Sequence, residues 1–186
     1  TSASPFCRFK IPSMKTISFC FSTSGLLLYF LLMAGMGTAL GQTQTIFSGN
    51  WSDGSNWNNG VPGNSSNADV YHAMTLNYNI SIGYRKQLLV HSGGSITDPN
   101  GSNKRKLTFA TETFFDVDGN VTVEGDFDVG YRSTIVVRSY DTLIVGDADF
   151  AAEINLTIEE FGVMIINGDF DIGYRGNIIV NGNLYV

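Results

Sequence analysis

Apolar residues alternate with polar ones in many short stretches of this chain, for example in residues 121–123 and 127–129. Alternation predicts half-buried β-strands, because successive side chains of a strand point to opposite faces. No apolar stripe with helical spacing persists, so we expect an all-β protein. The predicted strands are residues 76–82, 87–90, 107–109, 114–117, 121–123, 127–129, 134–137, 143–145, 154–158, 163–166, 170–172, 177–180 and 184–186. Residues 93–105 are predicted to be a loop.

One segment of the chain occurs twice. Residues 125–132 (Gly-Asp-Phe-Asp-Val-Gly-Tyr-Arg) return at 168–175 with a single change, an offset of 43 residues, and a weaker copy begins at Gly146. The period is therefore 21 and then 22 residues, which is typical of solenoids whose coils pack against their neighbours. Because the units are strands, the predicted fold is a right-handed parallel β-helix. The alternative is a β-sandwich, which gives no reason for near-identical segments at this spacing.

Alignment of the copies predicts which side chains point inward. Two apolar columns result: Phe127, Ala148 and Phe170 in one, and Val129, Phe150 and Ile172 in the other. Neighbouring strands lie about 4.8 Å apart, so an alanine between two phenylalanines avoids overpacking. The tight corners are predicted at glycines with positive φ, a conformation that costs glycine little. These glycines are Gly125, Gly130, Gly146, Gly168, Gly173 and Gly182.

The first part of the chain has the pattern of an export signal. Met14 and Lys15 precede an apolar run over residues 25–37, and small residues lead up to Gln42. This order predicts a secretory signal peptide over residues 14–41, with residues 1–13 as upstream read-through. Residues 42–76 are aromatic and non-repetitive and are predicted to form an N-terminal cap. Residues 77–186 are predicted to be β-helix repeats that are truncated at the C-terminus, because the sequence stops inside a strand.

Charge and cysteine content narrow the class of partner. The chain has 11 basic and 17 acidic residues. Removal of the predicted signal leaves eight basic residues, a net charge of −9, and no cysteine, since Cys7 and Cys20 both precede Gln42. The negative charge disfavours nucleic acid and anionic membranes as partners. We therefore expect a secreted or cell-surface protein that is held together by packing and not by disulfides.

The main candidate site is a set of carboxylates. If Phe127 points inward, its neighbours point outward, and the same holds in the next two copies. The resulting columns contain Asp126, Asp128, Asp147, Asp149, Asp169 and Asp171. Such oxygen ligands suit Ca²⁺, the only cofactor that the sequence suggests. The alternative is a solvated acidic face whose repulsion is relieved by Arg132, Arg138 and Arg175.

The segment around the two tryptophans resembles a known class of proteins. Residues 50–63 (Asn-Trp-Ser-Asp-Gly-Ser-Asn-Trp-Asn-Asn-Gly-Val-Pro-Gly), followed by residues 67–70 and 76–82, resemble the start of secreted, adhesin-like β-helix surface proteins of Bacteroidetes. They also resemble the opening of the G8 domain. The resemblance implies a surface-exposed or secreted protein and supplies no catalytic residue. Trp51 and Trp57 are interpreted as a cap over the end of the coil, or alternatively as a platform that stacks on sugars.

No catalytic constellation is visible in the sequence. His72 and His91 lack metal-ligand spacing, and no Gly-x-Ser-x-Gly elbow or phosphate-binding loop occurs. We therefore predict a structural or adhesive module that contacts extracellular polysaccharide or another cell-surface ligand, without catalysis in these residues and without a membrane span after signal removal. The alternative is the N-terminal part of a secreted carbohydrate-active enzyme, a polysaccharide lyase or glycoside hydrolase that acts through outward aspartates.

Overall fold

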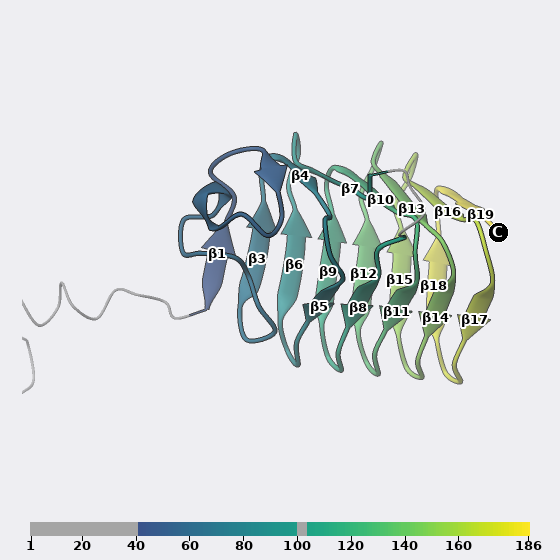
Figure 1. Ribbon diagram of the computed structural model, residues 1–186. Coiled ribbons are helices and arrows are strands. Elements are labelled where there is room, and N and C mark those ends of the chain that lie inside the picture. Colours follow the sequence, from purple (N-terminus) through teal and green to yellow (C-terminus); the bar gives the residue numbers. More distant parts are fainter. Residues whose placement is uncertain (1–40, 100–103) are drawn as a thin grey trace, which may run out of the picture. The chain divides into compact units, whose positions relative to one another are not determined.

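The structure, a computed structural model, describes residues 41–99 and 104–186. These residues form a β-solenoid of about six turns. Figure 1 shows its strands stacked side by side, from β1 at the start of the described chain to β17, β18 and β19 near Val186. Three sheets of seven, seven and five strands wrap around one core. The fold is thus all-β and repetitive, as the alternation and the repeat predict.

Five successive coils contribute one strand to each sheet, and the first and last coils contribute only to the first two sheets. The first sheet consists of β1 (Gln42–Gln44), β3 (Asn67–Val70), β6 (Gln87–Val90), β9 (Phe114–Val117), β12 (Thr134–Val137), β15 (Asn155–Ile158) and β18 (Asn177–Val180). The second consists of β2 (Gly49–Asn50), β4 (Ala73–Thr75), β7 (Ser95–Thr97), β10 (Asn120–Val123), β13 (Thr142–Val145), β16 (Val163–Ile166) and β19 (Asn183–Tyr185). The third consists of β5 (Ile80–Ile82), β8 (Leu107–Phe109), β11 (Phe127–Val129), β14 (Ala148–Phe150) and β17 (Phe170–Ile172).

The pairing of the strands decides between a solenoid and a sandwich. The strand pairs of the described residues are parallel, and one isolated antiparallel bridge joins Thr45 to Trp57. Phe127 pairs with Ala148, and Ala148 pairs with Phe170, so one coil takes 21 residues and the next takes 22. A sandwich of antiparallel hairpins is therefore excluded, and the predicted period corresponds to one coil.

The N-terminal segment joins the sheets earlier than its sequence suggests. Strand β1 pairs with β3, and β2 pairs with β4, so parts of the predicted cap, residues 42–76, already belong to the first coils. Within this segment the chain between β2 and β3 departs most from the repeat and includes a short 3-10 helix, η1 (Gly54–Asn56). Strand β7 was also missed, because residues 93–105 are rich in Gly, Ser and Asn; it pairs with both β4 and β10.

The two predicted apolar columns lie in the core. Phe127, Ala148, Val129 and Phe150 are each at most 2% exposed, and the phenylalanine rings of successive coils meet edge-to-face. The small Ala148 pairs directly with Phe127, as the overpacking argument requires. In the last coil the inward columns are less covered, and Ile172 is 46% exposed.

The prediction that the corner glycines are needed for a positive φ is wrong. None of the six predicted glycines has a positive φ. They are required because the neighbouring coil is close: a Cβ atom on Gly125 would lie 2.4 Å from the carbonyl oxygen of Arg105, and one on Gly130 would lie 2.6 Å from the carbonyl carbon of Ala110. Positive φ occurs instead at four glycines outside the predicted set, Gly41, Gly49, Gly60 and Gly93, and at seven non-glycine residues, namely Arg85, Glu112, Arg132, Tyr140, Glu153, Phe161 and Arg175.

The structure tests the prediction of a membrane span only in the described residues, and the predicted export signal lies almost wholly outside them. The predicted signal peptide, residues 14–41, lies outside the described residues except for Gly41. Within residues 41–99 and 104–186, no helix is long and apolar enough to cross a membrane.

Candidate functional site

The six predicted aspartates form two columns on the outside of the third sheet. Asp128, Asp149 and Asp171 are direct register partners on β11, β14 and β17, between inward-pointing residues. The other three immediately precede these strands at exposed positions: Asp126, Asp147 and Asp169. The parallel register therefore places the carboxylates where the alignment predicts them.

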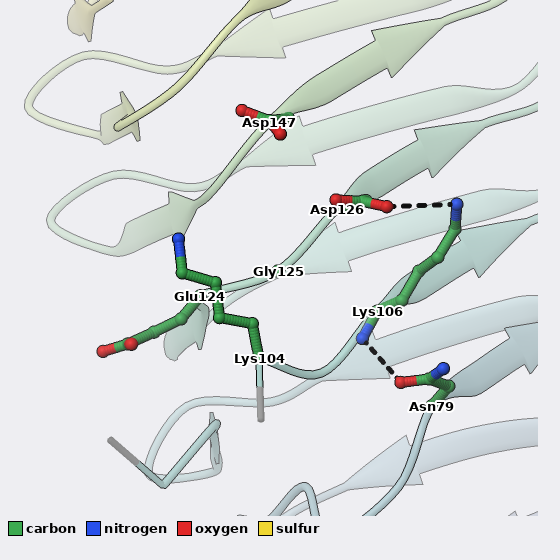
Figure 2. Close-up of a pocket in the computed structure, with 7 residues that line it drawn as sticks. All are labelled: Asn79, Lys104, Lys106, Glu124, Gly125, Asp126 and Asp147. Atoms are coloured by element: carbon green, nitrogen blue, oxygen red, sulfur yellow. Dashed lines mark hydrogen bonds and ion pairs between the residues drawn. The ribbon is translucent and has the colours of Figure 1, made fainter. Parts of the chain in front are cut away.

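A lysine, and none of the predicted arginines, neutralises the first of these carboxylates. Lys106 Nζ lies 2.5 Å from Asp128 Oδ2 and 3.4 Å from Asp126 Oδ2, and the hydrogen bond with Asp128 raises the pKa of Lys106. Figure 2 shows Lys106 reaching towards Asp126 across a shallow cavity of about 190 Å³, which is also lined by Asp147. Arg132 and Arg175 pair with Glu153, and Arg138 pairs with Asp116. The prediction that these arginines relieve the repulsion among the six aspartates is therefore wrong.

The columns do not converge on a single point in the described structure. Asp147 Oδ1 accepts a hydrogen bond from the backbone N–H of Asp169, on the next coil, at 3.0 Å, so this carboxylate oxygen is already bonded within the protein. No group of three or more His, Cys, Asp or Glu side chains in residues 41–99 and 104–186 is arranged to hold a metal ion. Calcium binding by these six residues stays a prediction.

The two tryptophans belong to the core. Trp51 is 0% exposed and Trp57 is 3% exposed, and their rings meet edge-to-face at 4.7 Å. The indole Nε1 of Trp57 donates a hydrogen bond to the carbonyl oxygen of Trp51 at 2.9 Å. Protein covers both rings, so they offer no platform for a sugar. Their packing instead fills the non-repetitive part of the first coil.

A charged ladder at one corner of the solenoid escaped the sequence interpretation. The third residue after each strand of the third sheet has left-handed backbone geometry. These residues, which we name the corner ladder, are Arg85, Glu112, Arg132, Glu153 and Arg175. The backbone N–H of each of the first four donates a hydrogen bond to the next coil, as from Glu112 to the carbonyl oxygen of Tyr131 at 2.8 Å. Opposite charges therefore alternate from coil to coil.

Ion pairs join the members of the corner ladder. Arg85 Nε lies 2.6 Å from Glu112 Oε2, and Arg132 Nε lies 2.9 Å from Glu153 Oε2. Arg175 Nη1 approaches the other oxygen of Glu153 at 3.4 Å. Hydrogen bonds from Arg85 and Arg132 lower the pKa values of Glu112 and Glu153, respectively. The ion pairs thus favour the charged form of both glutamates.

A tyrosine precedes each arginine of the ladder. Tyr84, Tyr131 and Tyr174 belong to the three Gly-Tyr-Arg copies, and the guanidinium that follows lies over each ring at 4.8, 4.8 and 5.8 Å from the centroid. Tyr84 is 53% exposed and Tyr174 is 69% exposed, whereas the hydroxyl of Tyr131 bonds to Glu153 at 3.0 Å. The repeated Gly-Tyr-Arg was visible in the sequence. Glu112 and Glu153, which lie between these copies, could not be found in this way, because the coils that carry them lack the Gly-Tyr-Arg motif.

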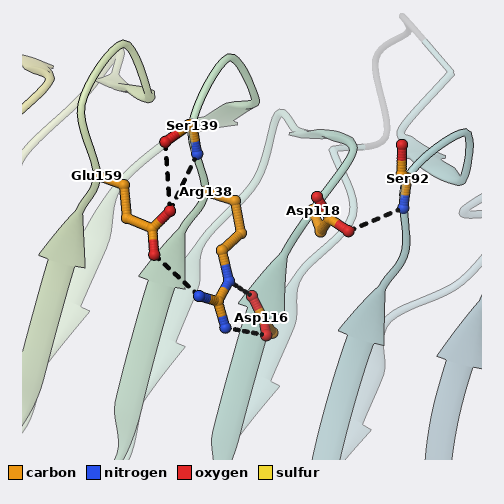
Figure 3. A network of polar contacts seen from close by, with 6 residues as sticks. All are labelled: Ser92, Asp116, Asp118, Arg138, Ser139 and Glu159. Carbon is orange, nitrogen blue, oxygen red and sulfur yellow. Dashed lines mark hydrogen bonds and ion pairs between the residues drawn. The ribbon is translucent and has the colours of Figure 1, made fainter.

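A second polar cluster, around Arg138, lies at the C-terminal ends of three strands of the first sheet, β9, β12 and β15. Figure 3 shows its guanidinium between two carboxylates: it makes two hydrogen bonds of 2.8 Å with Asp116 and one of 2.9 Å with Glu159. The hydrogen bonds with Asp116 raise the pKa of Arg138. Arg138 is therefore an electrostatic link between three adjacent coils.

The same cluster borders a groove of about 340 Å³. His91, Asp118 and Arg138 line it together with Asp116, Leu89 and Val90. His91 Nε2 lies 3.1 Å from Oδ1 of Asp69, a buried carboxylate, and the imidazole stacks on Tyr71 at 4.0 Å. A histidine oriented by a buried aspartate can serve in proton transfer or as a hydrogen-bonding group for a ligand.

Exposed aromatic side chains also occur at the corner between the first and second sheets. Tyr140 is 78% exposed, Phe161 is 53% exposed, and their rings stack at 5.0 Å. This pair follows strands of the first sheet, whereas the Tyr-Arg row precedes strands of that sheet, so the two groups lie at different corners.

The comparisons with known proteins add no family to this picture. Protein-family models, curated proteins and solved structures gave no significant match to the chain.

Proposed function

We propose that this chain is a non-catalytic surface module that holds an extended extracellular glycan against the Tyr-Arg corner of its solenoid. A single observation carries the proposal. Tyr84, Tyr131 and Tyr174 lie in one row, each beside a guanidinium, and the first and last rings are more than half exposed. Aromatic rings stack on sugars, and adjacent charged groups bond to hydroxyls, so such a row suits a long ligand with repeated contacts.

Two features of the sequence support an extracellular setting. Residues 14–41 have the pattern of a secretory signal peptide. Residues 50–63 resemble the start of secreted, adhesin-like β-helix proteins of Bacteroidetes and of G8 domains. The formal net charge of −6 disfavours nucleic acid as a partner. An adhesive or structural role at the cell surface agrees with each of these features.

Affinity electrophoresis through gels that contain different polysaccharides tests the proposal. We expect at least one polysaccharide to retard the purified protein, and the double variant Tyr84→Ala/Tyr174→Ala to migrate freely. Tyr140→Ala removes an exposed aromatic ring from the other corner and is the matched control, which should still be retarded. If no polysaccharide retards the protein, or if the double variant is retarded as strongly as the parent, the proposal fails.

One observation favours a second candidate, a carbohydrate-active enzyme. His91, which Asp69 orients, lines the groove together with Asp118 and Arg138, so an oriented imidazole and a carboxylate border the same groove. Release of reducing ends or unsaturated products from any of the polysaccharides, with loss of release in His91→Gln, would establish this function. Loss in Asp128→Asn or Asp171→Asn would place the reaction on the outer columns instead.

A further inference from the structure

The surface at the corner ladder repeats every two coils, although the solenoid repeats every coil. Coils that end in Tyr-Arg alternate with coils that end in Thr111-Glu112 or Ala152-Glu153. The five coils that carry the ladder therefore form a surface with a doubled period. This doubling requires a physical explanation.

The core does not impose the doubled period. In the last three of these coils, Phe127 and Phe170 alternate with Ala148, so core packing could set the alternation there. In the first two coils, Ile80 and Ile82 pair with Leu107 and Phe109, and all four are large and buried. The corner nevertheless already alternates from Arg85 to Glu112.

Charge pairing explains only the acidic and basic members of the ladder. An arginine beside a glutamate avoids like charges on neighbouring coils. Pairing requires no ring next to the arginine, and at exposed sites a cation–π contact contributes only about 0.5–1 kcal/mol. Tyr84 and Tyr174 leave more than half of their surface in water. Their regular placement therefore indicates a ligand that covers them.

The spacing of the rings defines the repeat of that ligand. Adjacent strands of a sheet are about 4.8 Å apart, so equivalent positions two coils apart are separated by about 10 Å. This distance is comparable to the advance of one disaccharide in an extended β-1,4-linked glycan, whose alternate sugars present the same face. From Tyr84 to Tyr174 the row spans about 19 Å, four strand spacings.

The polar groups between the rings favour a neutral glycan. Among the described residues, Arg85 and Arg132 use Nε towards a glutamate and make no hydrogen bond with either Nη. Donors from arginine and acceptors from Glu112 and Glu153 therefore alternate along the row, an arrangement that suits hydroxyl groups. A polyanion would meet these glutamates and the negative charge of the whole chain.

We infer that the corner ladder with its three tyrosines binds a neutral, extended β-1,4-linked glycan in register, one disaccharide for every two coils. The inference rests on the proposed function and specifies the class and register of its ligand. Each tyrosine stacks on one sugar of a disaccharide, and the intervening glutamate accepts hydrogen bonds from the other sugar. Binding free energy then accumulates in steps of one disaccharide.

Calorimetric titration with neutral β-1,4-linked oligosaccharides of increasing length tests the inference. Affinity should rise strongly from disaccharide to trisaccharide and from tetrasaccharide to pentasaccharide, where the added sugar reaches a further tyrosine, and little at the steps between them. Tyr131→Ala should weaken hexasaccharide binding roughly tenfold, the size expected for the loss of one aromatic stacking contact. Tyr140→Ala should leave the affinity unchanged, and thermal melting of each variant controls for folding.

A variant that moves a ring without removing it tests the register. Tyr131→Ala/Ala152→Tyr shifts the central ring to the next coil and keeps the number of tyrosines. It should bind the hexasaccharide no better than Tyr131→Ala alone, and full recovery of affinity would overturn the register.

The outcomes separate this inference from the proposed function. If only α-linked or polyanionic polysaccharides bind, and they do so through the same tyrosines, the inference is overturned and the proposed function stands. If no glycan binds, both are overturned.

Discussion

Arg138 holds Asp116 of the preceding coil with two parallel hydrogen bonds, from Nε to Oδ1 and from Nη2 to Oδ2, each 2.8 Å long. The side chains of Arg138 and Asp116 are 40% and 18% exposed, whereas the arginines of the corner ladder are 55–76% exposed and its glutamates 24–29%. Two-pronged charged hydrogen bonds are the strong ones, and water screens the exposed pairs. The Arg138 link should therefore contribute more to stability than any rung of the ladder.

Replacement of Arg138 by glutamine should destabilise the fold by about 1 kcal/mol after allowance for solvent screening. For a domain of this size the melting temperature should fall by about 2–4 °C. Arg132→Gln removes an exposed, single contact and should cost less than about 0.5 kcal/mol. Thermal melts of both variants check the order, and an equal loss in the two would contradict it.

Asp141 beside this cluster should destabilise the protein at neutral pH. Partial burial, and then the charges of Asp118, Asp116 and Glu159, raise the pKa of Asp141 above its ordinary value of 3.8. A carboxyl group with a raised folded-state pKa contributes stability when protonated, and the contribution is lost as the pH rises through that pKa. Asp141→Asn should therefore raise the melting temperature at pH 7.

The pH dependence of the gain in melting temperature shows whether the charge of Asp141 is its cause. It should disappear as the pH falls below the ordinary value of 3.8, where Asp141 is protonated in both folded and unfolded states. Glu160→Gln removes the same charge from an exposed position and should give a smaller gain at pH 7. A gain for Asp141→Asn that persists unchanged in acid would argue against an electrostatic origin.

The fold could be predicted because the alternation and the period both reflect the core. Phe127, Ala148 and Phe170 are aligned by simple matching of the two copies, and the structure pairs them in that order. Strand β7 could not be found in the same way, since Ser95–Thr97 contains one buried residue, Ile96, between glycines and polar residues. Its partners on β4 and β10, and not its own sequence, stabilise it as a strand.

The surface was harder to predict because ion pairs depend on neighbouring coils. The sequence suggests that Arg132 and Arg175 neutralise the nearby aspartates, which are only a few residues away. In the structure both arginines reach Glu153, which lies about one coil from each. Exposure also bears on the two interpretations of the tryptophans: Trp51 and Trp57, the most obvious aromatics, are buried, which disfavours the alternative of a sugar platform, whereas Tyr84 and Tyr174 are open to solvent.

The size alternation of the core can be tested at its smallest member. Ala148→Phe would place a third large ring beside Phe127 and Phe170, with Phe150 on the same strand. Overpacking of this kind typically costs about 1–3 kcal/mol. Asp149→Phe introduces the same side chain one residue later, on the outside, and should change the unfolding free energy much less. Denaturant unfolding compares the two, and equal stabilities would refute the inward assignment of Ala148.

The glycines at the corners allow a test of close approach against backbone conformation. A Cβ atom on Gly130 would lie 2.6 Å from the carbonyl carbon of Ala110, although the φ of Gly130 is not positive. Gly93 has a φ of +84° and nothing within 4 Å of its Cβ position. Asparagine tolerates positive φ better than alanine does, but it carries the same Cβ atom. Gly130→Asn and Gly130→Ala should therefore destabilise the protein similarly, and each by more than about 1 kcal/mol.

At Gly93 the two substitutions should differ. The surrounding space is open, so the only cost is the left-handed conformation, about 1–2 kcal/mol for alanine. Gly93→Asn should be less destabilising than Gly93→Ala, because the asparagine side chain can form local hydrogen bonds in this conformation. Chemical denaturation of the four variants measures both differences. If asparagine recovered stability at Gly130 as it does at Gly93, backbone conformation and not the neighbouring coil would be the reason for glycine at that corner.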